Sequence, residues 1–224
     1  MKKQFSCIAA AVLSLSAAGA WAQSTVYVGG VYIDVHSSAP ALQGGQALPP
    51  PGAQIKVDDA STVGFGYAYR FTPNWSVEAA LGIPPTHKTY GEGFIEPFGQ
   101  ISSVKQVAPT VFANYHFAPM AQIEPFVGVG INYTRFTDAH STASGEAASG
   151  GPTRIELSDS WGLAAHVGAS YLIDKNWSIV GTIAYADVKS DLTATTTTNT
   201  GDVVRTTQIK FNPVAYTLSV GYSF

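Results

Sequence analysis

The stretch that decides the fold is Val214-Ala215-Tyr216-Thr217-Leu218-Ser219-Val220-Gly221-Tyr222-Ser223-Phe224. Every second residue from Val214 to Phe224 is apolar, and the residues between them are small or polar. A period of two predicts a β-strand, because successive side chains of a strand point to opposite faces. A strand of a soluble sandwich can show the same alternation. A large apolar face that ends on an aromatic residue, however, is typical of outer-membrane barrels, whose strands face lipid on one side and the lumen on the other.

The beginning of the chain predicts export. Lys2 and Lys3 precede an apolar run over residues 8–20, and Ala20-Trp21-Ala22 fits the small-x-small cleavage rule. We therefore expect a signal peptide over residues 1–22, since the run is too short for a membrane anchor. Cys7 is the only cysteine of the chain and lies within this segment. Residues 23–224 hold no thiol, which excludes disulfides and cysteine-ligated metals.

Charge and composition exclude other classes of protein. Without Lys2 and Lys3, 10 basic residues stand against 15 acidic ones, so a basic nucleic-acid-binding surface is not expected. Charged residues make up 12% of the chain, about half the usual globular share. No later stretch is long and apolar enough for a membrane helix. Export, few charges and no such helix together favour a β-barrel of the Gram-negative outer membrane.

Alternation continues along the chain and predicts eight strands. They are expected at residues 25–36, 61–71, 75–83, 105–117, 123–136, 158–172, 177–188 and 208–224, with a bulge at Asn212-Pro213. Residues 72–74, 118–122 and 173–176 are short connections, whereas residues 37–60, 84–104, 137–157 and 189–207 are long and rich in Pro, Gly, Ser or Thr. The fold expected for residues 23–224 is a single all-β domain, an antiparallel up-and-down transmembrane barrel. Its short turns would face the periplasm and its long loops the outside.

Aromatic residues gather near the short connections. We expect these side chains to face outward and to form a girdle: Tyr27, Tyr69, Phe71, Trp75, Tyr115, Phe117, Tyr171, Trp177, Tyr222 and Phe224. The β-propensity of aromatic residues explains their presence in strands but not their shared level. Tyr222 and Phe224 are also candidates for the signal that the barrel-assembly machinery reads on the last strand.

Inward positions of the predicted strands are mostly small. Small lining residues leave room for a solute, although glycines also serve twist and curvature. The candidate ligand path is Gly64, Gly66, Thr110, Phe112, Phe126, Gly128, Gly130, Asn132 and His166. Neutral and aromatic residues predict a narrow, weakly polar tunnel rather than an aqueous ion pore with charged rings.

The inward face near the short turns carries charge instead. The turn at 72–74 places Arg70 opposite Ser76, with Glu78 diagonal to it on the same face. Buried charges need partners. We expect a polar plug near the periplasmic mouth, made of Arg70, Glu78, His116 and Glu124.

The position of the last two members depends on the register of one hairpin. If Phe117 pairs with Ile123, then His116 lies opposite Glu124. Such a plug would block a straight water path, so a solute that enters from outside would have to leave sideways.

Prolines mark a possible lateral exit. Pro109 lacks the backbone donor that a strand needs, and Pro84-Pro85 ends the neighbouring strand. We expect a weak seam at Pro84, Pro85 and Pro109. A bulge at Pro109 is the alternative.

Five stretches carry a family resemblance. They are VGFGYAYRFTPNWSVEAALGIPPTH (63–87), VAPTVFANYHF (107–117), EPFVGVGINYTRF (124–136), SWGLAAHVGASYLIDKNWSIVGTIAYADVKSD (160–191) and NPVAYTLSVGYSF (212–224). In this order they resemble the OmpW family of small outer-membrane barrels, which includes the alkane-uptake protein AlkL. The resemblance implies a hydrophobic channel for passive passage of small hydrophobic molecules, with lateral release into the bilayer. The first three long loops depart from the family pattern, so the resemblance does not name the solute.

Three functions are weighed. The first is this passive channel, and the second is a filled structural barrel whose loops act as a receptor or adhesin. The third, a lipid-modifying enzyme, is disfavoured because His166 and Ser170 are about 13 Å apart along one strand, too far for a base and its nucleophile. No cofactor or metal is expected, since the histidines show no ligand spacing. The expected partners are outer-membrane lipid, lipopolysaccharide and hydrophobic solutes, and we expect a monomer that binds no nucleic acid.

Overall fold

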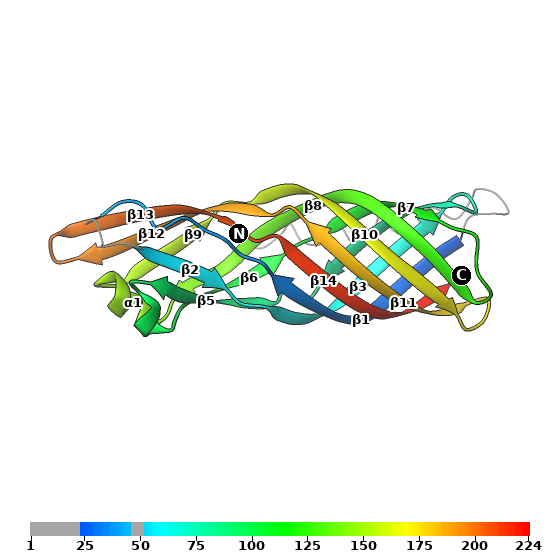
Figure 1. Cartoon of the computed structure of the whole chain (residues 1–224), viewed down its shortest axis with the longest axis horizontal. Coiled ribbons are helices and arrows are strands. Elements are labelled where there is room, and N and C mark those ends of the chain that lie inside the picture. The colour runs from blue at the N-terminus through cyan, green and yellow to red at the C-terminus, as the bar shows by residue number, and fades with distance from the viewer. Residues whose placement is uncertain (1–22, 46–51) are drawn as a thin grey trace, which may run out of the picture.

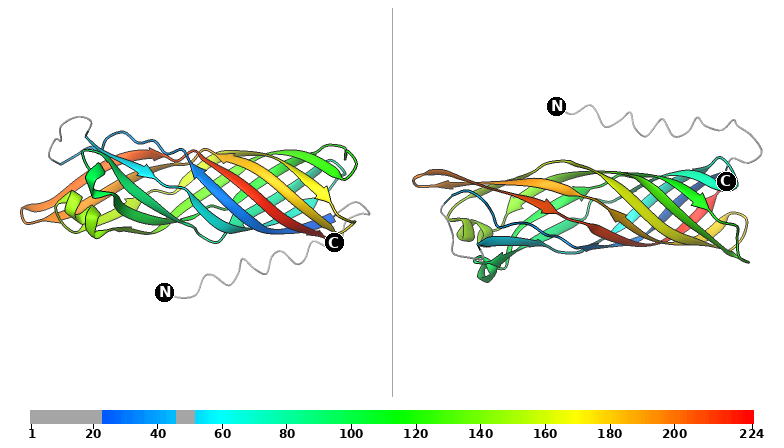
Figure 2. Two further views of the ribbon diagram at one scale, coloured as in Figure 1. Left: turned by 60° about the horizontal axis from the view of Figure 1, so that its bottom comes forward. Right: turned by 45° about the horizontal axis from the view of Figure 1, so that its top comes forward.

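The computed structural model describes residues 23–45 and 52–224, so the expected signal peptide lies outside the described residues. The molecule is an elongated tube (Figures 1 and 2). Its barrel strands are β1 (Gln23–Val35), β3 (Ala60–Arg70), β4 (Trp75–Gly82), β7 (Thr110–His116), β8 (Ile123–Ser141), β10 (Ser160–Leu172), β11 (Trp177–Ala186) and β14 (Pro213–Ser223). Each pairs antiparallel with the next, and β14 pairs with β1 to close the ring. The predicted eight-stranded antiparallel barrel is confirmed.

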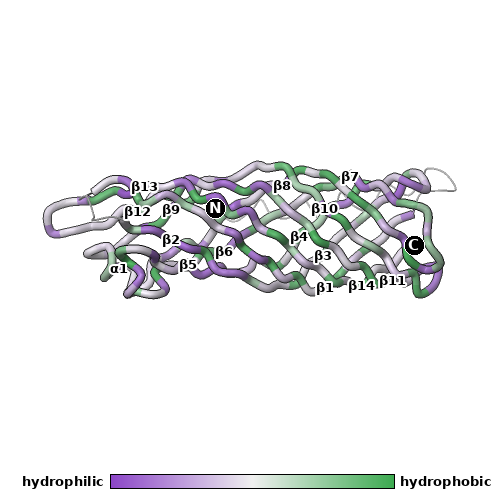
Figure 3. Tube along the Cα trace, viewed as in Figure 1, coloured by the Kyte–Doolittle hydropathy of each residue, from purple (hydrophilic) through white to green (hydrophobic). Residues whose placement is uncertain are grey.

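The two faces of the barrel wall follow the predicted alternation. On β10, Trp161 and Leu163 are 73% and 76% exposed, whereas Ala164 and His166, which follow them at inward positions, are 5% exposed. Figure 3 shows hydrophobic and hydrophilic positions alternating along the barrel strands. Large apolar side chains on the outside and small or polar ones inside are what a lipid-facing wall requires. Among the described residues, no helix is both long and apolar enough to cross a membrane.

Beyond the barrel, the long connections are mostly strands rather than the irregular loops predicted. They form β2 (Ala53–Val57), β5 (Thr86–Gly93), β6 (Gln100–Val107), β9 (Thr153–Leu157), β12 (Lys189–Thr198) and β13 (Gly201–Lys210), with a 3₁₀ turn η1 (Glu96–Phe98) and one short helix α1 (Ala143–Ser149). The strands pair with one another and with the upper half of β8. The result is an extension that continues the tube away from the short turns, with the β12–β13 hairpin projecting furthest (Figure 2).

An apolar core explains why these segments pair. Short alternating runs in β12, where Ser190 and Leu192 are buried while Lys189 and Asp191 are exposed, place one apolar face inside the extension. The buried cluster is Val35, Ala53, Ile55, Val57, Ile95, Val104, Phe136, Val188, Leu192, Ile209 and Phe211. Phe136 and Phe211 stack with their ring centroids 5.0 Å apart. The Pro and Gly residues around these segments favoured loops in the sequence, although most of them lie at strand ends and turns and Gly91 lies within β5.

Two of the expected strands are interrupted. The segment 105–117 divides at Ala108-Pro109 into β6 and β7, and the segment 208–224 divides at Phe211-Asn212 into β13 and β14. Pro109 has no N–H to donate, and Asn212 has a φ of 41°, which breaks the extended backbone. The irregularity expected at Asn212-Pro213 is therefore a break between two strands.

The aromatic girdle forms near the short turns, with one exception. Trp75 packs against Tyr115, and Trp177 against Tyr222, with ring centroids 5.2 and 4.9 Å apart. Tyr27 was expected to face outward, but it lines the barrel interior. The outward positions of β1 are Val26 and Val28, so the alternation of that strand places Tyr27 inside.

Candidate functional site

The barrel encloses a cavity of about 220 Å³ between the core of the extension and the level of the short turns. Of the predicted ligand path, seven residues line it: Gly64, Gly66, Thr110, Phe112, Phe126, Asn132 and His166. The remaining lining is largely apolar or small and includes Val31, Ile33, Ala80, Ala184 and Ala215. Val188, a member of the extension core, also borders it. The cavity can therefore accept a small, mostly apolar guest.

Three rings form the floor of this cavity. Phe112 on β7 and His166 on β10 are stacked, with centroids 3.9 Å apart and planes inclined by 6°. Phe126 on β8 meets the His166 ring edge-on at 5.4 Å and 71°. All three side chains are buried. We call these three rings the floor; they narrow the cavity, which continues past them to His116.

Gly128 and Gly130 do not line the cavity as predicted. They lie in β8 directly opposite His166 and Phe112, respectively. A Cβ at Gly128 would collide with His166 Nε2 and Asn114 Oδ1, and a Cβ at Gly130 with Phe112 Cδ1. These two glycines instead make room for the floor rings to lie close to the wall.

Asn114 anchors the floor through its side-chain amide and is 1% exposed. His166 Nε2 donates to Asn114 Oδ1 at 2.8 Å, and Asn114 Nδ2 donates to Glu78 Oε2 at 2.7 Å. On the same wall, Asn132 Nδ2 donates to Thr110 Oγ1 at 2.8 Å. No buried side-chain N or O atom among the described residues lacks a hydrogen-bond partner. The fully buried polar side-chain atoms are thus satisfied within the protein.

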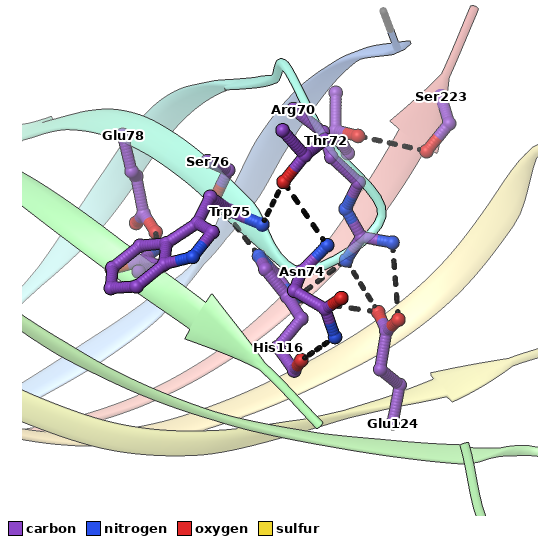
Figure 4. A network of polar contacts seen from close by, with 11 residues as sticks. Arg70, Thr72, Asn74, Trp75, Ser76, Glu78, His116, Glu124 and Ser223 are labelled. Atoms are coloured by element: carbon purple, nitrogen blue, oxygen red, sulfur yellow. Dashed lines mark hydrogen bonds and ion pairs between the residues drawn. The ribbon is translucent and has the colours of Figure 1, made fainter. Parts of the chain in front are cut away.

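Below the floor lies a polar cluster of Arg70, Ser76, His116 and Glu124, which we call the polar plug (Figure 4). Arg70 binds the Glu124 carboxylate through two N–H groups, at 3.0 and 2.7 Å. It also donates to His116 Nδ1 at 2.6 Å. Because arginine has only donors, Nδ1 must accept, and the opposite nitrogen of His116 donates to Ser76 Oγ at 2.9 Å.

Two details of the plug differ from the prediction. Arg70 does pair with Ser76, but His116 lies opposite Phe126 rather than Glu124, because Phe117 pairs with Pro125 and not with Ile123. The turn between these strands is therefore longer than expected. Glu78 is not a member of the plug. It lies apart from Arg70 in Figure 4 and is held by Asn114 at the edge of the cavity.

The predicted seam coincides with a gap in the wall ladder. The pairing of β4 with β7 ends at Ala80 and Thr110. The next backbone bond between the two segments joins Gln106 N to Pro85 O at 3.1 Å. Between these points Ile83 N bonds to β3, and Pro109 O accepts from Tyr133 of β8.

The cavity extends to this gap. Pro85 and Ala108 line it there, and so does Leu81, which is 56% exposed on the outer face. Pro84 lies at the gap without lining the cavity. The wall is therefore thinnest between β4 and β7, just above the floor.

Sequence reasoning missed several residues of the site. Tyr27 borders both the cavity and the smaller pocket on the far side of the plug, and Asn114 and Ser76 hold the floor and plug together. Asn114 and Ser76 both occupy inward positions in the alternating pattern of their strands, and this pattern was the signal in the sequence that could have identified them. Within the described residues, no group of three His, Cys, Asp or Glu side chains lies close enough to hold a metal.

Comparison with known proteins places the chain among outer-membrane barrels. The model of the OmpW family matches residues 26–224. Outer membrane protein W of Vibrio cholerae is 31% identical over 174 residues, covering 77% of each chain. Outer membrane protein AlkL of Ectopseudomonas oleovorans is 28% identical over 201 residues, covering 90% of this chain and 79% of AlkL.

Two further similarities extend over nearly the whole length. A Pseudomonas aeruginosa protein named for a dibenzothiophene metabolism operon, PahQ, is 27% identical and covers 91% of each chain. The crystal structure of OprG from the same species superposes with a TM-score of 0.82 at 23% identity, covering 91% of this chain and 96% of OprG. At that identity the superposition establishes the fold alone.

Proposed function

The chain belongs to the OmpW family and is an outer-membrane β-barrel, and from this premise we propose that it is a passive channel for small hydrophobic molecules. In this proposal the solute enters from the extracellular extension, occupies the cavity above the floor and leaves sideways into the bilayer. The observation that carries the proposal is the cavity itself. It is mostly apolar, it ends toward the short turns at the polar plug, and it extends to the gap between β4 and β7.

Physical chemistry favours an apolar guest. The lining is mostly small and apolar, so entry of water or an ion is less favourable than entry of an apolar guest. Burial of apolar surface contributes roughly 25 cal/mol per Å². Movement would be downhill, since the sequence shows no nucleotide-binding motif or other coupling element.

Two features support a lateral exit: the polar plug at one end of the cavity and the gap in its wall. The Arg70–Glu124 pair with His116 obstructs the axial path toward the periplasm. The gap at Pro84, Pro85 and Pro109 lacks the backbone bonds that close the wall elsewhere. A hydrophobic solute gains by moving from this gap into hydrocarbon rather than past a charged cluster. The name of the relative PahQ, which refers to a dibenzothiophene metabolism operon, supports a hydrophobic aromatic compound as one class of guest.

The test measures uptake of a radiolabelled alkane into vesicles with a lipopolysaccharide outer leaflet. Filling the cavity by Ala184→Trp should reduce the protein-dependent rate at least ten-fold, because Ala184 lines the cavity. Ala113→Trp is the matched control, since Ala113 is exposed on the outer face of β7. Equal rates in wild-type and Ala184→Trp vesicles would contradict the proposal.

A second variant separates the two exits. Arg70→Ala with Glu124→Ala should open the axial path and raise ion conductance, while alkane uptake stays at its wild-type rate if the solute leaves sideways. An alkane rate that rises together with conductance would indicate axial passage instead.

A filled structural barrel is the second candidate function. The stacked pair Phe136–Phe211 and the fully buried Val188 and Ile209 close the extension above the cavity. In this alternative the exposed β12–β13 hairpin would act as a receptor or adhesin. Uptake no faster than in protein-free vesicles would favour it.

A further inference from the structure

Glu78 is the one charged side chain, histidines aside, among the described residues that line the cavity. It lies at an inward position of β4 and is partly exposed. It borders the cavity but not the pocket on the far side of the plug, so its exposed surface is turned toward the cavity. The cavity therefore contains one carboxyl group in a lining that is mostly small and apolar.

The protein supplies no cation to balance this group. No Lys, Arg or His of residues 23–45 and 52–224 forms an ion pair with Glu78. Arg70 lies on the next inward pair of β3 and β4, but its N–H groups are directed to Glu124 and His116. The charges of Arg70 and Glu124 thus cancel, and that of Glu78 remains. Because a carboxylate away from bulk water is costly unless it is paired, the cavity favours a guest that brings a positive charge.

A chain of hydrogen bonds orients the carboxyl group. His166 Nε2 donates to Asn114 Oδ1 at 2.8 Å, and Asn114 Nδ2 donates to Glu78 Oε2 at 2.7 Å. No described residue donates to the second oxygen, Oε1. Since no buried side-chain oxygen of the described residues lacks a partner, Oε1 is accessible from the cavity. The chain thus fixes Glu78 through one oxygen and leaves the other free for a guest.

An aromatic ring lies beside the carboxyl group. Glu78 on β4 and Phe112 on β7 are directly opposite each other and share the inward face of the wall. Side chains in such positions have their Cβ atoms about 4.5–5.5 Å apart. One face of Phe112 stacks on His166 of β10, so its other face is turned to the β4 side, where Glu78 lies. A carboxylate beside the face of an aromatic ring suits an ammonium group, because both attract positive charge.

The wall above this pair has room for apolar groups. Ala80 and Thr110 form the next inward pair above Glu78 and Phe112, and they are the last pair before the gap. Gly66 lies opposite Ala80 on β3. Such small lining residues leave space for methyl, alkyl or aryl substituents. A metal ion fits less well, since it prefers several oxygen ligands and the described residues contain no group of three His, Cys, Asp or Glu that could hold one.

We infer that the cavity binds small organic ammonium ions with apolar substituents, with the positive nitrogen between Glu78 and the free face of Phe112. The substituents lie beside Ala80 and Gly66, next to the gap between β4 and β7. The inference rests on the proposed function, since it takes the cavity to be the place that a guest occupies. It adds amphiphilic cations to the hydrophobic guests, with Glu78 as the residue that selects them.

The experiment is equilibrium dialysis of labelled benzyltrimethylammonium against the protein in phosphatidylcholine nanodiscs, with empty nanodiscs as the baseline. The wild type should bind this cation at least ten-fold more tightly than phenylmethanesulfonate, which has a similar size and the opposite charge. Glu78→Gln should weaken cation binding at least ten-fold, whereas Glu78→Asp, which keeps the charge, should weaken it less. Glu156→Gln, at an exposed position of β9, is the matched control and should bind the cation as the wild type does.

Equal binding of the cation by the wild type and Glu78→Gln would overturn the inference. Equal binding of the two probes by the wild type would also overturn it, and that comparison needs no variant. Tighter binding of benzyl alcohol than of the cation would overturn it too and would indicate a neutral Glu78 that donates a hydrogen bond.

Alkane uptake by the wild type in vesicles separates this inference from the proposed function. Uptake faster than in protein-free vesicles, without selective cation binding, would contradict the inference alone. Selective cation binding that depends on Glu78, with uptake no faster than in protein-free vesicles, would support the binding site and contradict the channel.

Discussion

Phe112 and His166 lie face to face across the barrel interior, with their ring centroids 3.9 Å apart. They come from β7 and β10, which do not pair with each other but flank β8 on either side. Between them β8 carries Gly128 and Gly130, and only the absence of side chains there lets the two rings meet. The arrangement of the floor rings therefore depends on β7, β8 and β10 together.

Removal of one floor ring should widen the cavity above the plug. Phe112→Ala deletes a buried ring and is expected to lower the free energy of unfolding by about 3–5 kcal/mol. The same change should let a water-soluble quencher reach the lumen. Urea unfolding in lipid vesicles measures the stability, and Phe65→Ala, on the outer face, is the control for loss of a phenyl group. An unchanged stability for Phe112→Ala would mean that the stacking in the floor is not maintained.

Gly128 should tolerate substitution poorly, whereas Gly181 should tolerate it well. A Cβ at Gly128 meets Asn114 and His166, so Gly128→Ala is expected to cost about 1–3 kcal/mol of stability as an overpacked site. A Cβ at Gly181 meets open space, so Gly181→Ala should be neutral or slightly stabilising. Comparison of the two variants in one unfolding assay checks both, and equal effects would contradict the placement of the floor rings.

Removal of one charge of the Arg70–Glu124 pair should lower the stability of the barrel more than removal of both charges. Arg70→Gln leaves the Glu124 carboxylate, 9% exposed, without its bidentate partner, and we expect a loss of roughly 3–5 kcal/mol. Arg70→Leu combined with Glu124→Leu removes both charges and should cost less than the single change. Disruption of the exposed pair Arg154–Glu156 should stay within about 1 kcal/mol. A double variant less stable than the single one would show that the charges are not coupled.

Asp59 should make the junction of barrel and extension sensitive to acid. Its carboxylate accepts from Val35 N at 2.8 Å and from the Tyr32 hydroxyl at 2.7 Å. The bond from Val35, more than that from Tyr32, holds the pKa of Asp59 below its usual value. A lowered pKa gives a stabilisation that is complete above the ordinary aspartate pKa of about 3.9 and is lost as the pH falls through the lowered value.

The amide proton shift of Val35, followed by NMR between pH 7 and pH 2, reports on this bond. The shift should titrate with a midpoint below the ordinary aspartate value. Asp59→Asn should remove the titration while leaving the barrel amides unchanged. A midpoint above the ordinary aspartate pKa would contradict the predicted lowering of the Asp59 pKa.

Much of the barrel could be predicted because a lipid-facing wall constrains every strand in the same way. The alternation from Val214 to Phe224, and its equivalents elsewhere, fixed which residues face the lumen. The pairing of Arg70 with Ser76 followed from a short turn, whose length leaves little freedom of register. The turn after His116 is longer, and there the register was misjudged by two residues.

The extension was not predicted, for a physical reason. Its strands are short, and their apolar residues meet across long sequence separations, as Phe136 meets Phe211. Such a core leaves little local periodicity. For Pro109 the sequence left a seam and a bulge open, and for Tyr27 the outward prediction was wrong. Both placements depend on neighbouring strands as well as on the residue's own strand.

The succession of apolar core, aromatic floor and internally paired charges along one axis has an electrical consequence. A hydrated ion that entered from the extension would have to shed water in a segment lined mainly by small and apolar side chains, at a large desolvation cost. We therefore expect the barrel to conduct ions poorly.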